Sequence, residues 1–156
     1  MRETRSIIRP DGATGDVAVG GLFSGMIAGL AMTTYLALAA LTFGEGPLAM
    51  LSRFRGSDAS TPLVGLLLHL GVSGVYGIIF ALICKFTARS WGCEPSSWLA
   101  ASIGAGYGLA LWLLAQWVIL PGLNSPLMEI PRIHFFLGHQ IFGISLGLLT
   151  QLEVRE

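Results

Sequence analysis

Long apolar stretches separated by short polar segments dominate the chain. Charged residues are missing from four of these stretches, at residues 17–44, 59–84, 95–128 and 133–152. A helix that crosses a bilayer needs about 20 predominantly apolar residues, and each stretch is long enough. Because unpaired backbone groups are costly in lipid, each is expected to be a helix rather than a strand. The pattern predicts membrane spans near residues 18–42, 63–86, 97–120 and 133–152.

The predicted fold is all-α, a single bundle of four transmembrane helices. The membrane domain is expected over residues 17–152, after a flexible N-terminal tail at 1–16 and before a C-terminal tail at 153–156. The first apolar stretch exceeds the core of about 7 to 15 residues that a signal peptide contains, so it is interpreted as a membrane helix.

Composition agrees with a membrane protein. Hydrophobic residues make up 53% of the chain and charged residues 12%, whereas a soluble domain carries about 25% charged residues. The formal net charge is zero, so nothing favours a nucleic-acid partner. Cys84 and Cys93 lack the C-x-x-C spacing and are expected to be free thiols, with no metal site.

The basic residues predict the orientation. The N-terminal tail, the second loop and the C-terminal tail together hold six Lys and Arg, and the first and third loops hold three. By the positive-inside rule, both termini are expected in the cytoplasm. This predicts a multi-pass membrane protein with its second loop on the cytoplasmic side as well.

Small residues recur at every fourth position of the predicted spans. This spacing lets the backbone of a neighbouring helix approach closely, which stabilises helix pairs where no hydrophobic effect operates between them. The positions expected to pack helices together are Gly21, Gly25, Gly29, Gly65, Ser73, Gly77, Gly104, Gly108, Gly143 and Gly147.

Two histidines lie on the same helix faces as the small residues. His69 and His139 each follow the start of a predicted span by about six residues, and the two halves of the chain resemble one another as helical hairpins. Both rings are therefore expected to point into the bundle at one depth, where Gln116 of the third span completes a buried polar belt.

This belt allows several interpretations. The simplest is that neutral imidazoles hydrogen-bond within the bundle and fix the helix register. The second is that His69 and His139 are the axial ligands of a b-type haem, because such sites occur inside helix bundles. A carrier or a channel would need ionisable groups at the midplane, and the spans contain no Asp, Glu, Lys or Arg there.

An enzymatic interpretation starts from the sequence G-V-S-G at Gly71 to Gly74. It resembles the serine motif of rhomboid intramembrane proteases, which would make Ser73 the nucleophile and His139 the base. The six-helix core of that family and its oxyanion-stabilising helix have no counterpart in this sequence.

The loops carry weaker signals. The first loop is expected to form a short helix in the membrane interface, with Leu48, Met50, Leu51 and Phe54 toward lipid. His134, just before the fourth span, is expected to contact headgroups.

Four motifs resemble an uncharacterised bacterial family of small four-helix membrane proteins of unknown function. They begin at Gly25 (G-M-I-A-G-L-A), His69 (H-L-G-V-S-G-V-Y-G), Gly106 (G-Y-G-L-A-L-W) and His139 (H-Q-I-F-G). The resemblance spans residues 21–149 and implies an inner-membrane location without a known activity. At His69, Ser73 occupies the position of the usual glycine.

The function expected from the sequence is non-catalytic. The abundance of small-residue faces favours an accessory subunit of a larger membrane complex, in contact with the lipid bilayer and with a membrane-protein partner or a second copy of the chain.

Overall fold

The computed structural model describes residues 14–55, 61–91 and 96–154. Most of the predicted N-terminal tail and the end of the predicted C-terminal tail lie outside these ranges. The first described helix, α1 (Thr14–Ala40), is followed by a 3-10 turn, η1 (Leu41–Phe43), a short helix, α2 (Pro47–Ser52), and a second 3-10 turn, η2 (Arg53–Arg55).

Three more long helices follow the first loop. The long helices are α3 (Pro62–Trp91), α4 (Ser97–Leu114) and α6 (Arg132–Val154), and short segments lie between the last two: η3 (Ala115–Ile119), α5 (Leu120–Leu123) and η4 (Pro126–Glu129). Helix is the only regular secondary structure in the described ranges. Four segments are long and apolar enough to cross a membrane, so the predicted all-helical class and the four apolar helices are confirmed.

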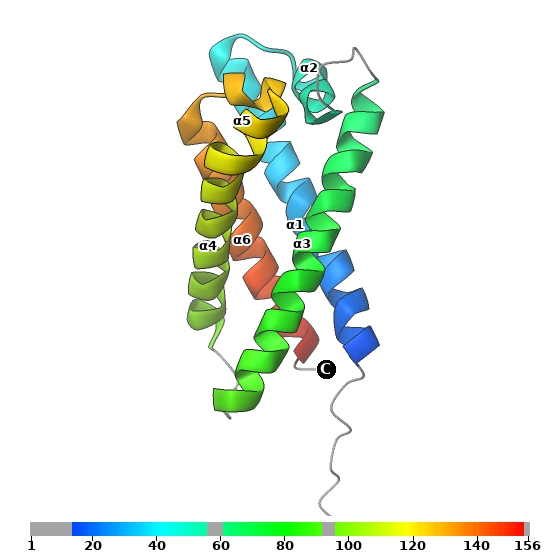
Figure 1. Cartoon of the computed structure of the whole chain (residues 1–156), viewed down its shortest axis with the longest axis vertical. Helices are drawn as coiled ribbons and strands as arrows, with labels where there is room; N and C mark the ends of the chain where they lie inside the picture. The colour runs from blue at the N-terminus through cyan, green and yellow to red at the C-terminus, as the bar shows by residue number, and fades with distance from the viewer. Residues whose placement is uncertain (1–13, 56–60, 92–95, 155–156) are drawn as a thin grey trace, which may run out of the picture.

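The long helices run side by side between two ends of the molecule (Figure 1). The start of α1 and the end of α6 lie at one end, which we call the terminal end. The elements α2 and α5 lie at the opposite end, which we call the loop end.

Helix packing follows the order α3, α1, α6, α4. Among the described residues, the extensive contacts between long helices are those of α1 with α3, α4 with α6, and α1 with α6. Helices α3 and α4 therefore stand at the two ends of the row. Tyr107 on α4 crosses the gap between them, because its hydroxyl donates a hydrogen bond of 2.9 Å to the carbonyl of Tyr76 on α3.

Glycines bring the backbones of α1 and α3 into direct contact. A Cβ atom added to Gly25 would overlap the carbonyl oxygen of Ser73, and one added to Gly77 would overlap that of Gly21. Gly29 lies against the Ser73 side chain. These residues are glycine because a larger side chain would force the two helices apart.

The pair α4 and α6 is packed by the same device. A Cβ atom added to Gly104 would overlap the carbonyl oxygen of Gly143, and the reverse also holds. Gly147 lies in the same way against the Ala100 carbonyl.

Large side chains fill the contact between the two pairs. Leu36 of α1 and Leu146 of α6 are fully buried, together with Met32 and Phe142 nearby in the core. Gly138 of α6 leaves room for the Leu36 side chain, since an added Cβ atom would lie only 3.3 Å from Leu36 Cγ.

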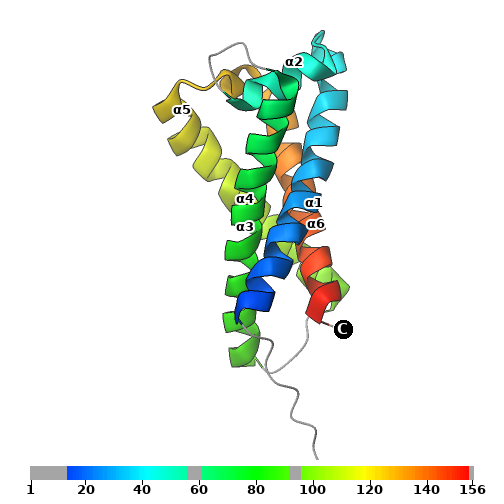
Figure 2. The ribbon, with the colours of Figure 1, turned by 90° about the vertical axis from the view of Figure 1, so that its right-hand side faces the viewer.

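Near the loop end, the third apolar segment changes from α-helix to π-helix. The π-helix η3 precedes Pro121, which has no backbone N–H and whose ring crowds the preceding turn. The wider turn is closed by the Leu120 N–H, which bonds to the Ala115 carbonyl five residues earlier. Beyond it, α5 leans away from α1 and α6 (Figure 2) and ends at Asn124 in the left-handed conformation, with φ of 47°.

The first loop forms the predicted short helix, but the expected orientation of two of its side chains is wrong. Met50 is fully buried instead of facing lipid, and Phe54 stacks on His69. The cause is a close approach of the chain, because a Cβ atom added to Gly65 on α3 would overlap the Leu51 carbonyl oxygen. The segment is thereby drawn onto the end of the bundle.

Candidate functional site

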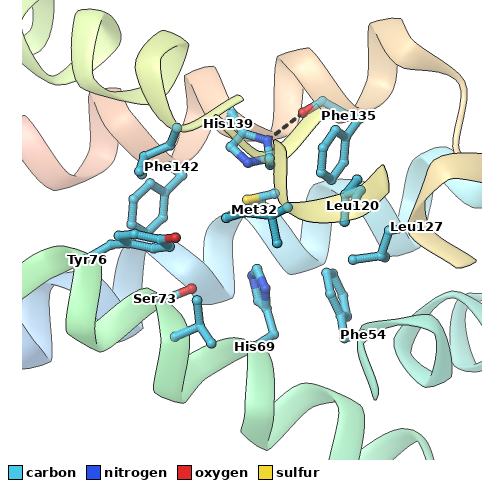
Figure 3. A pocket seen from close by; sticks show the side chains of 14 residues that line it. Met32, Phe54, His69, Ser73, Tyr76, Leu120, Leu127, Phe135, His139 and Phe142 are labelled. Atoms are coloured by element: carbon cyan, nitrogen blue, oxygen red, sulfur yellow. Dashed lines mark hydrogen bonds between the residues drawn. The ribbon is translucent and has the colours of Figure 1, made fainter. Parts of the chain in front are cut away.

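A pocket of about 140 Å³ lies within the bundle near the loop end. It brings His69 of α3 and His139 of α6 into one site, with Met32 of α1 between them in the view of Figure 3. Its lining is mostly apolar and aromatic, as in most small-molecule sites. The lining residues are Met32, Phe54, His69, Val72, Ser73, Tyr76, Leu111, Ala115, Ile119, Leu120, Leu127, Phe135, His139 and Phe142.

Helix α6 holds His139 in a defined orientation. The ring nitrogen Nδ1 lies 2.8 Å from the Phe135 carbonyl oxygen, one helical turn earlier, and the Phe135 ring packs edge-on against the imidazole. A carbonyl only accepts hydrogen bonds, so Nδ1 carries the proton and Nε2 is a free acceptor. Gly108 of α4 packs on the His139 backbone, where a Cβ atom would overlap the carbonyl oxygen.

His69 is held on the opposite wall of the pocket. Its ring stacks on Phe54 of η2 at a centroid distance of 4.2 Å and lies near the backbone of Gly29 on α1. Its Nε2 atom is buried without a hydrogen-bond partner in the structure. Leaving a buried acceptor unpaired costs about 1–3 kcal/mol, so Nε2 is the most conspicuous unsatisfied atom of the site.

Two further polar side chains line the pocket. Ser73 is buried on α3 beside Gly29, and Tyr76 lies one turn further along the same helix. Figure 3 shows both on the His69 side of the pocket, with Phe142 above Tyr76. The site therefore combines a few polar groups on two walls with aromatic rings between them.

A charged cluster closes the loop end above the pocket. Arg53 of η2 forms ion pairs with Glu45, at 2.5 Å, and with Glu129 of η4, at 2.7 Å. The same guanidinium donates to the Pro126 carbonyl at 2.8 Å. Burial alone would lower the pKa of Arg53, but the hydrogen bonds and charges of Glu45 and Glu129 outweigh burial and raise it. Arg53 thus ties the first loop to the third.

The third histidine has its own partners. His134 lies outside the pocket, where its Nδ1 is 3.0 Å from the Tyr35 hydroxyl and its Nε2 is 3.3 Å from the Thr42 hydroxyl. The expectation of headgroup contact alone missed this connection between α1 and α6, since the partners are more than 90 residues apart in sequence.

Gln116 is not among the lining residues of the pocket. It lies half-buried in the π-helix η3, whereas its neighbour Ala115 does line the pocket. The structure therefore brings together only the two histidines of the predicted belt. Phe54, Met32 and Ala115 are among the lining residues that sequence reasoning missed, because no local pattern marks them.

A b-type haem fits the donors of the pocket but not its volume. Two imidazoles with Nε2 unpartnered, one of which donates its Nδ1–H to a backbone carbonyl, match the way in which histidines bind metals. A cavity of about 150 Å³, however, accommodates one benzene molecule, and a porphyrin contains four pyrrole rings. At about 140 Å³, the pocket is several times too small for haem.

The protease interpretation gains no support from the geometry. Ser73 and His139 line the same pocket, but no hydrogen bond between them is present in the described part of the chain. A serine nucleophile needs its base within hydrogen-bond reach.

The described residues contain no cluster of three or more His, Cys, Asp or Glu that could hold a metal ion.

Fold and site together define a multi-pass helical membrane protein with a small internal pocket near one end of its bundle. No protein-family model, no curated protein and no solved structure matches this chain.

Proposed function

We propose that this protein is a non-catalytic subunit of a membrane complex and that it binds a partner helix through the exposed face of α4. The glycines that first suggested a partner mostly pack helices within the chain, so the proposal depends on a different surface. It is supported by one observation, an exposed stripe of small residues on the least buried long helix.

Helix α4 packs chiefly on α6, through Ala100, Gly104 and Gly108. Its opposite face is exposed and presents Ser102, Gly106 and Ala110, each four residues apart.

An added Cβ atom at Gly106 would meet nothing within 4 Å. The Ser102 hydroxyl is already bonded to the Trp98 carbonyl at 2.8 Å, so the stripe offers a smooth surface for close helix approach.

The proposal includes an orientation. The excess of Lys and Arg in the tails and the second loop favours both termini in the cytoplasm of a bacterial cell. The loop end, with its pocket, would then face the outer side of the inner membrane. Alternate labelling of single cysteines at the two ends in intact cells tests this orientation.

Replacement of Gly106 by leucine tests the partner surface. We expect wild-type protein, extracted gently from its native membrane, to migrate as a complex larger than one chain, and Gly106→Leu to migrate as a monomer with an unchanged melting temperature. Gly71→Leu is the matched control, because Gly71 of α3 is also exposed with nothing within 4 Å of an added Cβ atom. A wild-type monomer, or a complex that tolerates Gly106→Leu, contradicts the proposal.

The alternative of a haem-binding electron carrier would require the helices around the pocket to separate. An absorption spectrum of the purified protein decides it. A Soret band that His139→Phe removes would replace the non-catalytic proposal with that alternative.

A further inference from the structure

We propose that the pocket between His69 and His139 binds one monocyclic aromatic ring with two hydroxyl groups, the hydroquinone head of a membrane-soluble molecule. This inference is independent of the partner surface on α4. It depends on the acceptors, the volume, the lining and the access of the pocket.

The two imidazoles present matching acceptors. Nδ1 of His139 is bonded to the Phe135 carbonyl, which leaves Nε2 with a free lone pair. On His69, Nε2 is buried and has no hydrogen-bond partner among the described residues. A ligand that donates two hydrogen bonds, one toward α3 and one toward α6, satisfies both nitrogens in their neutral rings.

The volume limits the ligand to a single ring. About 140 Å³ is available, close to the roughly 150 Å³ of a cavity that holds one benzene molecule. Aromatic side chains from two elements, Phe54 of η2 and Phe135 and Phe142 of α6, line the space. Such a lining favours a flat ring, which can pack edge-to-face or offset against them.

The pocket reaches the surface on the side where α3 and α4 stand apart. Val72 lines the pocket, yet 53% of its surface is exposed. In η3, which follows α4, the π-helix residues Ala115 and Ile119 also line the pocket. Single π-helical turns often occur at functional sites, and here two residues of the turn line the pocket. A ligand with an alkyl tail can enter from the lipid and leave its tail between the two helices.

A bare metal ion fits the pocket less well. His69, His139 and the Met32 thioether are ligands that suit Cu(I), but an ion fills only a small part of the volume and uses none of the aromatic lining. Binding of Cu(I) at this site would therefore contradict the proposal.

The test compares two probes on the wild-type protein in nanodiscs of fixed lipid composition, by isothermal titration calorimetry under argon. The probes are decylhydroquinone and its dimethyl ether, which keeps the ring and tail but has no O–H donor. We expect saturable binding of one decylhydroquinone per chain and at least about tenfold weaker binding of the ether, for two lost hydrogen bonds. Equal binding of both probes, or no saturable binding, overturns the proposal.

Variants locate the site. His69→Phe and His139→Phe are each expected to weaken decylhydroquinone binding about tenfold, and Ala115→Leu is expected to abolish it by filling the pocket. His134→Phe makes the same chemical change outside the pocket and should leave binding unchanged. Binding that survives both pocket histidine variants overturns the proposal, as does stoichiometric Cu(I) binding that prevents wild-type protein from binding the probe.

Discussion

The half of the bundle nearer the terminal end and the half nearer the loop end are packed by different means. In the first, glycines such as Gly25, Gly77, Gly104 and Gly143 let backbones touch, and an added Cβ atom at any of them would overlap the facing helix. In the second, side chains as large as Leu36, Phe135 and Phe142 fill the space between the two helix pairs, and a pocket of about 140 Å³ remains among them.

Close crossing of the helices accounts for the packing of both halves. Helices that cross closely at one level diverge away from the crossing, so close packing of glycines in one half creates space in the other. Aromatic residues fill most of that space. The π-helix η3 widens it further, because its turn displaces the end of the third apolar segment.

The largest expected effect comes from breaking the glycine contact between α1 and α3. Gly77→Leu places a side chain where Gly21 and Gly25 leave no room, so we expect a loss of about 3 kcal/mol or more in the free energy of unfolding. Gly71→Leu on the exposed face of α3 is the control and should change stability little. Reversible unfolding in mixed micelles measures both, and equal stability of the two variants would contradict the packing described.

Removing the charged cluster should weaken the loop end. Arg53→Met leaves the largely buried Glu45 carboxylate without its ion pair, since only 19% of that side chain is exposed. We expect a loss of about 2 kcal/mol, between the values for exposed and buried ion pairs. Arg132→Met, at an exposed position on α6, should cost less than about 0.5 kcal/mol. Hydrogen exchange of α2 amides should rise in the first variant alone, and unchanged exchange would show that Arg53 does not tie the loops together.

A smaller effect is expected where α3 and α4 stand apart. Tyr107→Phe removes the hydroxyl that bonds to the Tyr76 carbonyl, and interhelical hydrogen bonds in membranes contribute about 0.6 kcal/mol on average. The same unfolding assay measures this loss. A cost above about 2 kcal/mol would exceed the largest such contributions and would mean that this bond is a principal connection between the two helix pairs.

The smallest effect should come from enlarging a residue at the pocket. Ala115→Leu adds three carbon atoms to a side chain that lines the open space of the pocket. In this it differs from Gly77→Leu, whose new side chain would meet the backbone of α1. We expect the free energy of unfolding to change by less than about 1 kcal/mol, because no neighbour must move. A loss as large as that of Gly77→Leu would show that the loop half is as tightly packed as the terminal half.

Much of the fold was predictable from local patterns. Apolar length alone indicates the four helices, because lipid accepts no unpaired backbone. The spacing of Gly21, Gly25 and Gly29 marks the face of α1 that does contact α3. The inward orientation of His69 and His139 follows from their position on such faces.

Other parts of the site depended on contacts between distant segments. Phe54 has the pattern of a lipid-facing residue, and it stacks on His69 only because Gly65 draws the first loop onto α3. Tyr35 and His134 meet across 99 positions of sequence. The π-helix turns Ala115 toward the pocket and leaves Gln116 out of its lining.

The sequence by itself determined that the chain is a set of four apolar helices with small residues on chosen faces, since both properties are local and repeat with the helical period. Only the tertiary structure decided which helices stand at the ends of the row, how the loops close over one end, and that a pocket remains between two imidazoles. Those features are set by the volume left over when whole helices pack, and no single segment carries that information.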